Sequence, residues 1–236
     1  ARLSGAAKVV SHTKRGRSVP GTVSVPFDPA LHRMDVYLSL VRSLDAETDP
    51  ADYGFALTPE EERYGSERRN ELPLDKKIVV LHPRTNWELK SWPPAYFAGL
   101  ADRLVRERGV TVVFTGTRED QPLVRSVMDA MAEDAVDWSG TMALRQFAGF
   151  LRTVDLFISA DTGAMHLASI AGARCLALFG PTDPELTGPQ GRGEVRIVRG
   201  DTGNCVVPCY NVSCSDNRCM KSISVETVFD EAAEML

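Results

Sequence analysis

The sequence has 236 residues, of which 43% are hydrophobic and 25% charged, as in an ordinary globular protein that can bury a core. Its net charge of −5 argues against nucleic acid as a partner, because proteins that bind nucleic acid usually carry a basic face. No apolar stretch approaches the roughly 20 residues of a membrane span, and the first residues lack the apolar core of a signal peptide. We therefore expect a cytoplasmic protein.

Basic residues gather at the start of the sequence. Five of them precede the first acidic residue, Asp28: Arg2, Lys8, Lys14, Arg15 and Arg17. Such a run is either a solvated segment or a surface that meets anionic lipid headgroups or a phosphorylated acceptor. The second alternative would allow peripheral contact with the inner face of the membrane.

The first 74 residues do not form a regular pattern. They predict a short strand at 23–25, an amphipathic helix between Met34 and Leu44, and a linker or exposed helix in the charged stretch 60–71. This is too little for a doubly wound domain. We expect residues 1–74 to be the end of an N-terminal domain that begins before Ala1, followed by a linker, and residues 75–236 to form a C-terminal domain.

From residue 78 onward, predicted strands and helices alternate. Apolar runs predict strands at 78–81, 110–114, 156–159 and 175–179, as expected of strands buried on both faces of a parallel sheet. Between them, one helix opens at Trp92-Pro93-Pro94 and ends at Gly109, and others cover 121–132, the segment after Thr141, and 165–171. This alternation predicts an α/β fold with a Rossmann-like parallel sheet.

Polar loops follow three of these strands, at the sheet edge where open α/β sheets bind ligands. In Asp161-Thr162-Gly163-Ala164-Met165-His166, Asp or Thr can cap the next helix, and Gly163 lets a ligand approach the backbone. The helix N-terminus then suits a diphosphate, with His166 about one turn inside. The structural alternative is an ordinary helix cap with a packed histidine.

The other two loops offer a cation and hydroxyl groups. The loop 82–93 holds Arg84, Thr85 and Lys90, and a lysine here can neutralise charge on a departing phosphate. The alternative is a solvated surface charge. The loop 179–184, Phe-Gly-Pro-Thr-Asp-Pro, leaves Thr182 available to a phosphate or a sugar, or else forms a purely structural turn.

The order and spacing of these motifs resemble glycosyltransferase family 9, the bacterial heptosyltransferase group. The matching features are a lysine two residues before Trp-Pro, a later Asp-Thr-Gly-x-x-His, and then Phe-Gly-Pro-Thr-x-Pro. The resemblance covers about two-thirds of the chain, from Lys77 to the end. It implies a GT-B fold, in which two Rossmann-like domains face each other across a cleft, with residues 75–236 as the nucleotide-sugar-binding domain and residues 1–74 as part of the acceptor domain.

The resemblance also implies the activity and the site. It implies inverting transfer of a heptose or related sugar from an ADP-sugar to a lipopolysaccharide core acceptor. Lys90 matches the family's phosphate-contacting lysine, which makes it the candidate catalytic residue. The candidate donor-binding residues are Thr85, Glu119, Asp120, Asp161, Thr162, Gly163, His166 and Thr182, with Glu119 and Asp120 as alternatives for the ribose.

Two further features concern the mechanism. The family's general base is an aspartate early in the N-terminal domain, a region absent here, so this chain alone is not expected to be catalytically complete. Thr85 is the sole representative of the paired hydroxyl residues that precede the lysine in some members. The sequence has no Asp-x-Asp motif, which agrees with a reaction that needs no metal and no cofactor.

Alternatives remain open for the function and for the cysteines. The chain could be an isolated, non-catalytic nucleotide-binding module, or an epimerase, which would need its own acid/base carboxylates in the cleft. Cys175 falls in a predicted strand and reads as a core residue. The C-terminal cluster of Cys205, Cys209, Cys214 and Cys219 suits structural thiols or a disulfide, a structural metal, or catalysis, although no gap has the two-residue spacing of common zinc sites.

Overall fold

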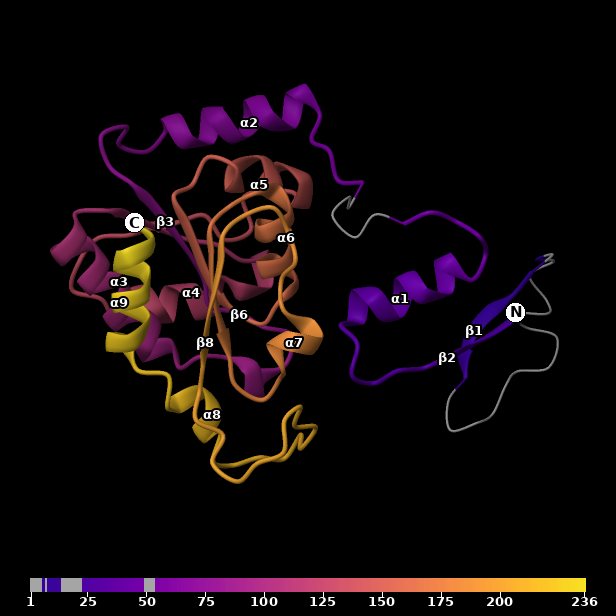
Figure 1. Cartoon of the computed structure of the whole chain (residues 1–236). Helices are drawn as coiled ribbons and strands as arrows, with labels where there is room; N and C mark the ends of the chain where they lie inside the picture. The colour runs from indigo at the N-terminus through magenta and orange to yellow at the C-terminus, as the bar shows by residue number, and fades with distance from the viewer. Residues whose placement is uncertain (1–5, 7, 14–22, 49–53) are drawn as a thin grey trace. The chain divides into compact units, whose positions relative to one another are not determined.

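The computed structural model describes residues 6, 8–13, 23–48 and 54–236 (Figure 1). The chain divides into two compact units, a smaller one that comprises the residues up to Gly54 together with Glu185–Thr187, and a larger one that comprises Phe55–Pro184 and Gly188–Leu236. Of the five basic residues at the start of the sequence, all except Lys8 lie outside the described residues. No helix in the described ranges is long and apolar enough to cross a bilayer.

The smaller unit pairs two short parallel strands with one helix. Strands β1 (Val10–Thr13) and β2 (Val23–Pro26) align Val10 with Val23, and helix α1 (Arg33–Arg42) follows. His12 links β1 to α1, because its Nε2 donates to the carbonyl of Val36 at 2.9 Å. The predicted strand at 23–25 and the predicted amphipathic helix are confirmed, whereas β1 was not predicted.

The larger unit contains a six-stranded, fully parallel sheet. Its order is β5-β4-β3-β6-β7-β8. The bounds are β3 Ile78–His82, β4 Thr111–Phe114, β5 Val136–Asp137, β6 Leu156–Ala160, β7 Cys175–Phe179 and β8 Val195–Arg199. The chain winds outward from β3 to β5 and then in the other direction from β6 to β8. The winding therefore reverses between β3 and β6, which is where doubly wound sheets bind ligands.

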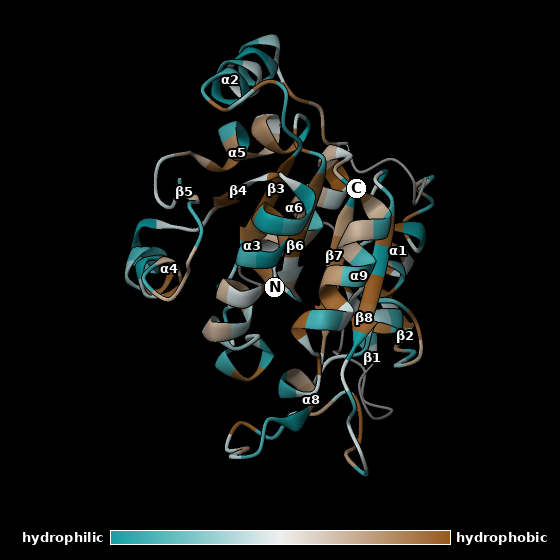
Figure 2. Cartoon of the chain, turned by 90° about the vertical axis from the view of Figure 1, so that its left-hand side faces the viewer, coloured by the Kyte–Doolittle hydropathy of each residue, from teal (hydrophilic) through white to brown (hydrophobic). Residues whose placement is uncertain are grey.

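Helices cover both faces of this sheet. Alternate strand residues point to opposite faces, so Val79 and Leu81 join one core and Ile78 and Val80 the other. The first face is covered by α3 (Pro94–Arg108), α4 (Gln121–Met128), α8 (Arg218–Lys221) and α9 (Val225–Met235). The second is covered by α5 (Leu144–Leu151) and α6 (Gly163–Ala171). Figure 2 shows the result, with mostly hydrophobic strands inside and helices of mixed hydropathy around them.

Helix α2 (Pro59–Asn70) packs on α5 (Figure 1). The two helices cross at glycines, since a Cβ on Gly65 would collide with the carbonyl of Gly149. Glu61 pairs with Arg145, and Arg152 pairs with Glu62 at 2.8 Å. The charged stretch 60–71 is therefore a helix of the larger unit, and the compact unit begins at Phe55, twenty residues before the boundary predicted after residue 74.

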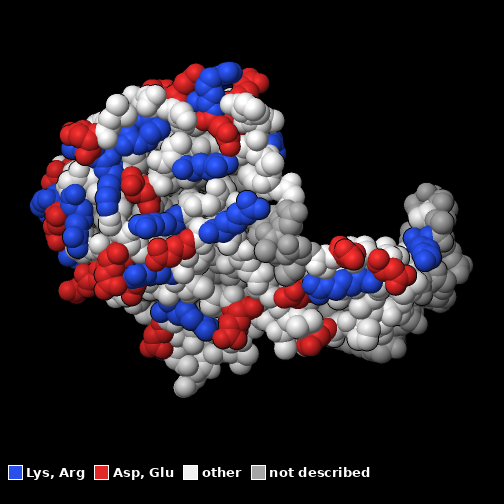
Figure 3. Space-filling model, turned by 45° about the horizontal axis from the view of Figure 1, so that its top comes forward, with Lys and Arg blue, Asp and Glu red and all other residues white. Residues whose placement is uncertain are grey.

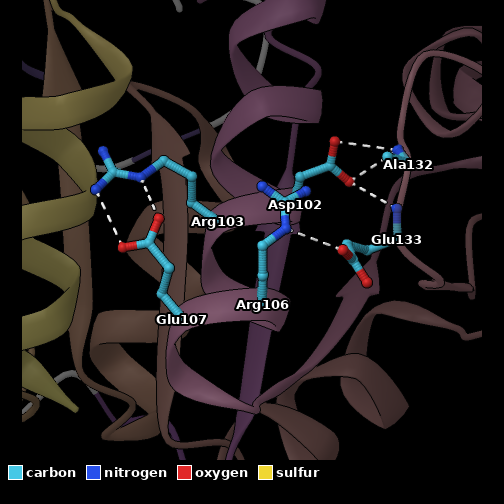
Figure 4. A network of polar contacts seen from close by, with 6 residues as sticks. All are labelled: Asp102, Arg103, Arg106, Glu107, Ala132 and Glu133. Atoms are coloured by element: carbon cyan, nitrogen blue, oxygen red, sulfur yellow. Dashed lines mark hydrogen bonds and ion pairs between the residues drawn. The ribbon is translucent and has the colours of Figure 1, made fainter.

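Charged side chains at the surface form hydrogen bonds and ion pairs between α3 and the loop after α4. The carboxylate of Asp102 in α3 accepts backbone N–H groups of Ala132 and Glu133 at 2.9–3.0 Å, which fixes the loop after α4 (Figure 4). Arg106 reaches Glu133 at 3.1 Å in the same network. On the face of the larger unit that Figure 3 displays, acidic and basic side chains are interspersed.

The cysteines are free thiols. Cys175 is buried in β7, as predicted, and burial raises the pKa of its thiol to about 12. Before α8, Cys214 accepts the backbone N–H of Asn217 at 3.4 Å, and within α8 the thiol of Cys219 donates to the Asn217 side chain at 3.6 Å. Among the described residues, no group of three or more His, Cys, Asp or Glu side chains is placed to hold a metal ion.

Candidate functional site

A cavity of about 800 Å³ opens in the larger unit at the carboxyl ends of the strands. Its walls come from the ends of β3, β4 and β5, from α5, and from the start of α6. The lining residues are His82, Arg84, Asn86, Thr115, Gly116, Thr117, Arg118, Asp120, Trp138, Gly140, Met142, Leu144, Phe147, Thr162, Gly163 and Ala164. The cavity therefore lies at the point where the winding of the sheet reverses.

One wall of the cavity is apolar. It is formed by Trp138 and Met142 from the segment after β5, and by Leu144 and Phe147 from α5. Trp138 is only 7% exposed, and its ring meets the ring of Phe150 edge-on at 5.0 Å. An apolar wall that contains an indole ring suits the face of a planar heterocycle.

His82 adds a neutral imidazole to this wall. Its Nδ1 lies 3.2 Å from the hydroxyl of Thr115, and its ring lies near those of Phe147 and Phe157. Burial lowers the pKa of His82 to about 4, and the negative charge of Asp120 opposes this shift only in part. The side chain is therefore uncharged at neutral pH and does not contribute a positive charge to the site.

The opposite side of the cavity is polar and built on the turn after β4. The carboxylate of Asp120 accepts the backbone N–H of Thr117 at 2.7 Å and its hydroxyl at 2.8 Å, while Arg84 lies 3.6 Å away. Glu119 is exposed and does not line the cavity, and a hydrogen bond from its own backbone N–H lowers its pKa. Of the two alternatives for the ribose, only Asp120 therefore faces the cavity.

Helix α6 begins at the cavity wall. Thr162 is its N-cap, in extended conformation and without a side-chain hydrogen bond to the helix, and Thr162, Gly163 and Ala164 all line the cavity. A Cβ added to Gly163 would meet no protein atom within 4 Å. The first N–H groups of a helix lack intrahelical partners and favour anions. The geometry at Gly163 thus leaves room for an anionic group close to the backbone.

An ion pair stands directly before this helix. The Nζ of Lys90, in the 3₁₀ turn Glu88–Lys90, lies 2.7 Å from an oxygen of Asp161, the residue that precedes Thr162. The Asp161 side chain is 7% exposed and that of Lys90 23%. The pair joins the loop after β3 to the loop after β6, two of the three loops that the sequence singled out.

Three other predicted site residues do not line the cavity. The buried hydroxyl of Thr85 donates to the carbonyl of Trp87 at 2.7 Å and lies 2.8 Å from the hydroxyl of Ser91. His166 is half-buried in α6. Thr182 follows β7, and its buried hydroxyl has no hydrogen-bond partner within the described part of the chain. The candidate site is thus divided between residues of the cavity and residues of the loops beside it.

Sequence reasoning missed the apolar wall. Trp138 and Met142 follow β5, a two-residue strand with half-buried residues that left no recognisable pattern. Arg118, also in the cavity, lies beside the Glu119-Asp120 pair that the sequence did single out. The available signal in the sequence was Trp138 two residues before Gly140, a glycine that the structure places at a φ of +68°.

The fold and the cavity are typical of nucleotide-binding domains. The larger unit is a doubly wound α/β sheet, and the N-terminus of a helix lies at a cleft where the winding of the sheet reverses. The model of glycosyltransferase family 9 (heptosyltransferase) matches residues 21–215, most of the chain. The chain therefore belongs to glycosyltransferase family 9.

Curated relatives support this assignment. The chain is 26% identical to lipooligosaccharide heptosyltransferase 2 of Campylobacter jejuni over 167 residues, 68% of this chain and 51% of that protein. It is 32% identical to lipopolysaccharide heptosyltransferase 1 of Pseudomonas aeruginosa over 156 residues, 64% of this chain and 42% of that protein. The chain thus spans about half the length of the curated relatives that it matches.

Solved structures share the fold. The family 9 glycosyltransferase of Veillonella parvula superposes with a TM-score of 0.76 at 24% identity, over 91% of this chain and 62% of that one. For the ADP-heptose heptosyltransferase II of Escherichia coli the TM-score is 0.77 at 18% identity, over 99% and 71%. These neighbours confirm the predicted fold class, an α/β fold of the GT-B type.

Proposed function

We propose that this chain is the donor-binding part of an inverting, metal-independent glycosyltransferase. The enzyme moves a heptose or a related sugar from an ADP-sugar to a lipopolysaccharide core acceptor. The observation that carries this proposal is the cavity beside the start of α6 and the Lys90–Asp161 pair, in a chain of glycosyltransferase family 9.

Different parts of the cavity suit the base, the ribose and the diphosphate of a nucleoside diphosphate. The apolar wall around Trp138 and Met142 takes the base, and Asp120, held by Thr117, takes a ribose hydroxyl. The diphosphate then lies against Gly163, where the helix N-terminus favours negative charge. This order puts the sugar beyond the diphosphate, outside the apolar part of the cavity.

Lys90 supplies the positive charge that the leaving diphosphate requires. In the structure its ammonium group is held by Asp161, which keeps it near the start of α6. During transfer an acceptor hydroxyl attacks the anomeric carbon, its proton passes to a general base, and the bond to the diphosphate breaks. Lys90 and the N-terminus of α6 stabilise the departing charge.

We assign the general base and the binding of the acceptor to the N-terminal domain. In this proposal the base is a carboxylate of that acceptor domain; this chain spans about half the length of the curated relatives that it matches. We assign any peripheral contact with the inner face of the membrane to the same N-terminal domain, to which residues 1–74 of this chain contribute. In isolation, the chain binds the nucleotide without completing transfer.

A calorimetric titration tests the proposal. ADP, UDP and GDP are titrated into the chain and into its Lys90→Ala and Asp161→Asn variants, with Lys76→Ala, an exposed lysine outside the cavity, as the matched control. We expect selective binding of ADP, weakened about tenfold or more by both site variants and unchanged in the control. Preference for UDP or GDP would refute the ADP-sugar donor, and no binding at millimolar nucleotide would refute the nucleotide site itself.

A further inference from the structure

Helix α2 contacts Trp138, one of the residues that form the apolar wall of the cavity. The guanidinium of Arg68 lies over the indole of Trp138, with its central carbon 4.0 Å from the ring centroid. The Arg68 side chain is only 18% exposed, so the contact is largely shielded from water. A cation over the face of a tryptophan is a favourable arrangement, and it becomes stronger as water is excluded.

Arg68 is itself held in place by hydrogen bonds. Its Nη1 donates to a carboxylate oxygen of Glu71 at 2.6 Å, and its Nη2 lies 3.4 Å from the hydroxyl of Thr141. That hydroxyl donates to the carbonyl of Trp138 at 2.9 Å. Arg68 therefore acts on Trp138 twice, through the face of its ring and, by way of Thr141, through its backbone.

The contact lies on a helix that is fixed to the same wall at other points. The crossing at Gly65 and Gly149 and the pair Arg152–Glu62 hold α2 against α5. Helix α5 in turn contributes Leu144 and Phe147 to the cavity. Since Phe150 of α5 meets the edge of Trp138 at 5.0 Å, the indole is confined between α2 and α5.

From these contacts we propose that Arg68 is a positioning residue for nucleotide binding, acting through Trp138. It holds the indole in the orientation in which the ring lines the cavity, so the base meets a preformed wall. The inference rests on the proposed function, because it takes the cavity as the nucleotide site. It extends the donor site to α2, a helix that contributes no lining residue of its own to the cavity.

The test compares Arg68→Met, which removes the cation and keeps an unbranched apolar side chain, with Arg68→Lys, which restores the charge. Arg63→Met is the matched control, because Arg63 lies on the same helix, is 67% exposed and pairs with Glu67 at 3.8 Å. Each variant is titrated with ADP, its thermal midpoint is measured, and its near-ultraviolet circular dichroism is recorded. A Trp138→Phe variant identifies the band of Trp138.

We expect Arg68→Met to weaken ADP binding about fivefold and to diminish the band of Trp138. Arg68→Lys should recover most of the affinity and of the band, and Arg63→Met should match the unaltered chain. Unchanged ADP affinity in Arg68→Met, with binding by the unaltered chain, would overturn the inference alone. Equal weakening in Arg68→Met and Arg68→Lys, tracking the loss in thermal midpoint with an unchanged band, would also overturn it by assigning Arg68 a purely structural role. No ADP binding by the unaltered chain would overturn the proposed function first.

Discussion

The half-buried imidazole of His82 predicts how the stability of the larger unit depends on pH. Burial lowers the pKa of His82 from its ordinary value of 6.5 to about 4 in the folded chain. The unfolded chain, in which the imidazole is solvated, regains the ordinary value. Between these two values the unfolded state binds a proton that the folded state does not, so the free energy of unfolding falls as the pH falls.

The size of the effect follows from the two pKa values. The contribution of His82 is fully present above pH 6.5 and is lost progressively as the pH falls toward 4. Linkage gives a loss of about 2 kcal/mol at pH 5, which levels off near 3 kcal/mol below pH 4. This is a large part of the about 5–15 kcal/mol by which a domain is stable.

Urea denaturation at pH 7.5 and pH 5 measures this loss. The unaltered chain and a His82→Gln variant, which keeps a polar group without an ionisable ring, are unfolded at both values. The other titrating groups are common to both proteins, so the difference between the two pH-dependent losses isolates His82. We expect the unaltered chain to lose about 2 kcal/mol more than the variant. Equal losses in both proteins would refute the conclusion that His82 is held in its neutral form in the folded chain.

Two further predictions concern the packing that supports the cavity. Gly65→Ala should destabilise the larger unit by about 1–2 kcal/mol in urea denaturation, because its Cβ meets the carbonyl of Gly149. The control is Gly99→Ala in α3, which should be neutral or stabilising because its Cβ meets only Val225, at 3.7 Å. Equal effects of the two substitutions would contradict the close crossing of α2 and α5. Asp102→Ala should lower the free energy of unfolding by about 1–2 kcal/mol, because two backbone N–H groups lose their acceptor. The control is Glu107→Ala, which removes the exposed pair with Arg103 seen beside it in Figure 4 and should lower it by less than about 0.5 kcal/mol. A similar loss in both variants would contradict the assigned role of Asp102.

The central strands of the sheet were predictable because they are buried on both faces. The runs 78–81 and 175–179 are continuously apolar, and both are buried throughout. At the edges of the sheet this signal disappears. Strand β8 carries Arg196 and Arg199, and only Val198 within it is buried, so its sequence reads as a mixed loop.

The candidate site was predictable where it follows the ends of these strands. The loops that hold Lys90 and Asp161 come directly after two predicted strands, and the structure joins them by an ion pair across 71 residues of sequence. The apolar wall could not be predicted in the same way, because it depends on the short strand β5. The contact of Arg68 with Trp138 joins two elements across the fold, and no local pattern in the sequence encodes it.

Gly163 offers the most direct test of the claim that a nucleotide diphosphate lies at the start of α6. A Gly163→Ala substitution adds a methyl group where no protein atom lies within 4 Å, so the fold should be unaffected. The measurement is the calorimetric Kd for ADP of the unaltered chain and of this variant, with thermal midpoints as a check and Gly99→Ala as the control. The account predicts an unchanged midpoint and ADP binding weakened about tenfold or more by the methyl group. Equal ADP affinity in the variant and the unaltered chain would contradict it.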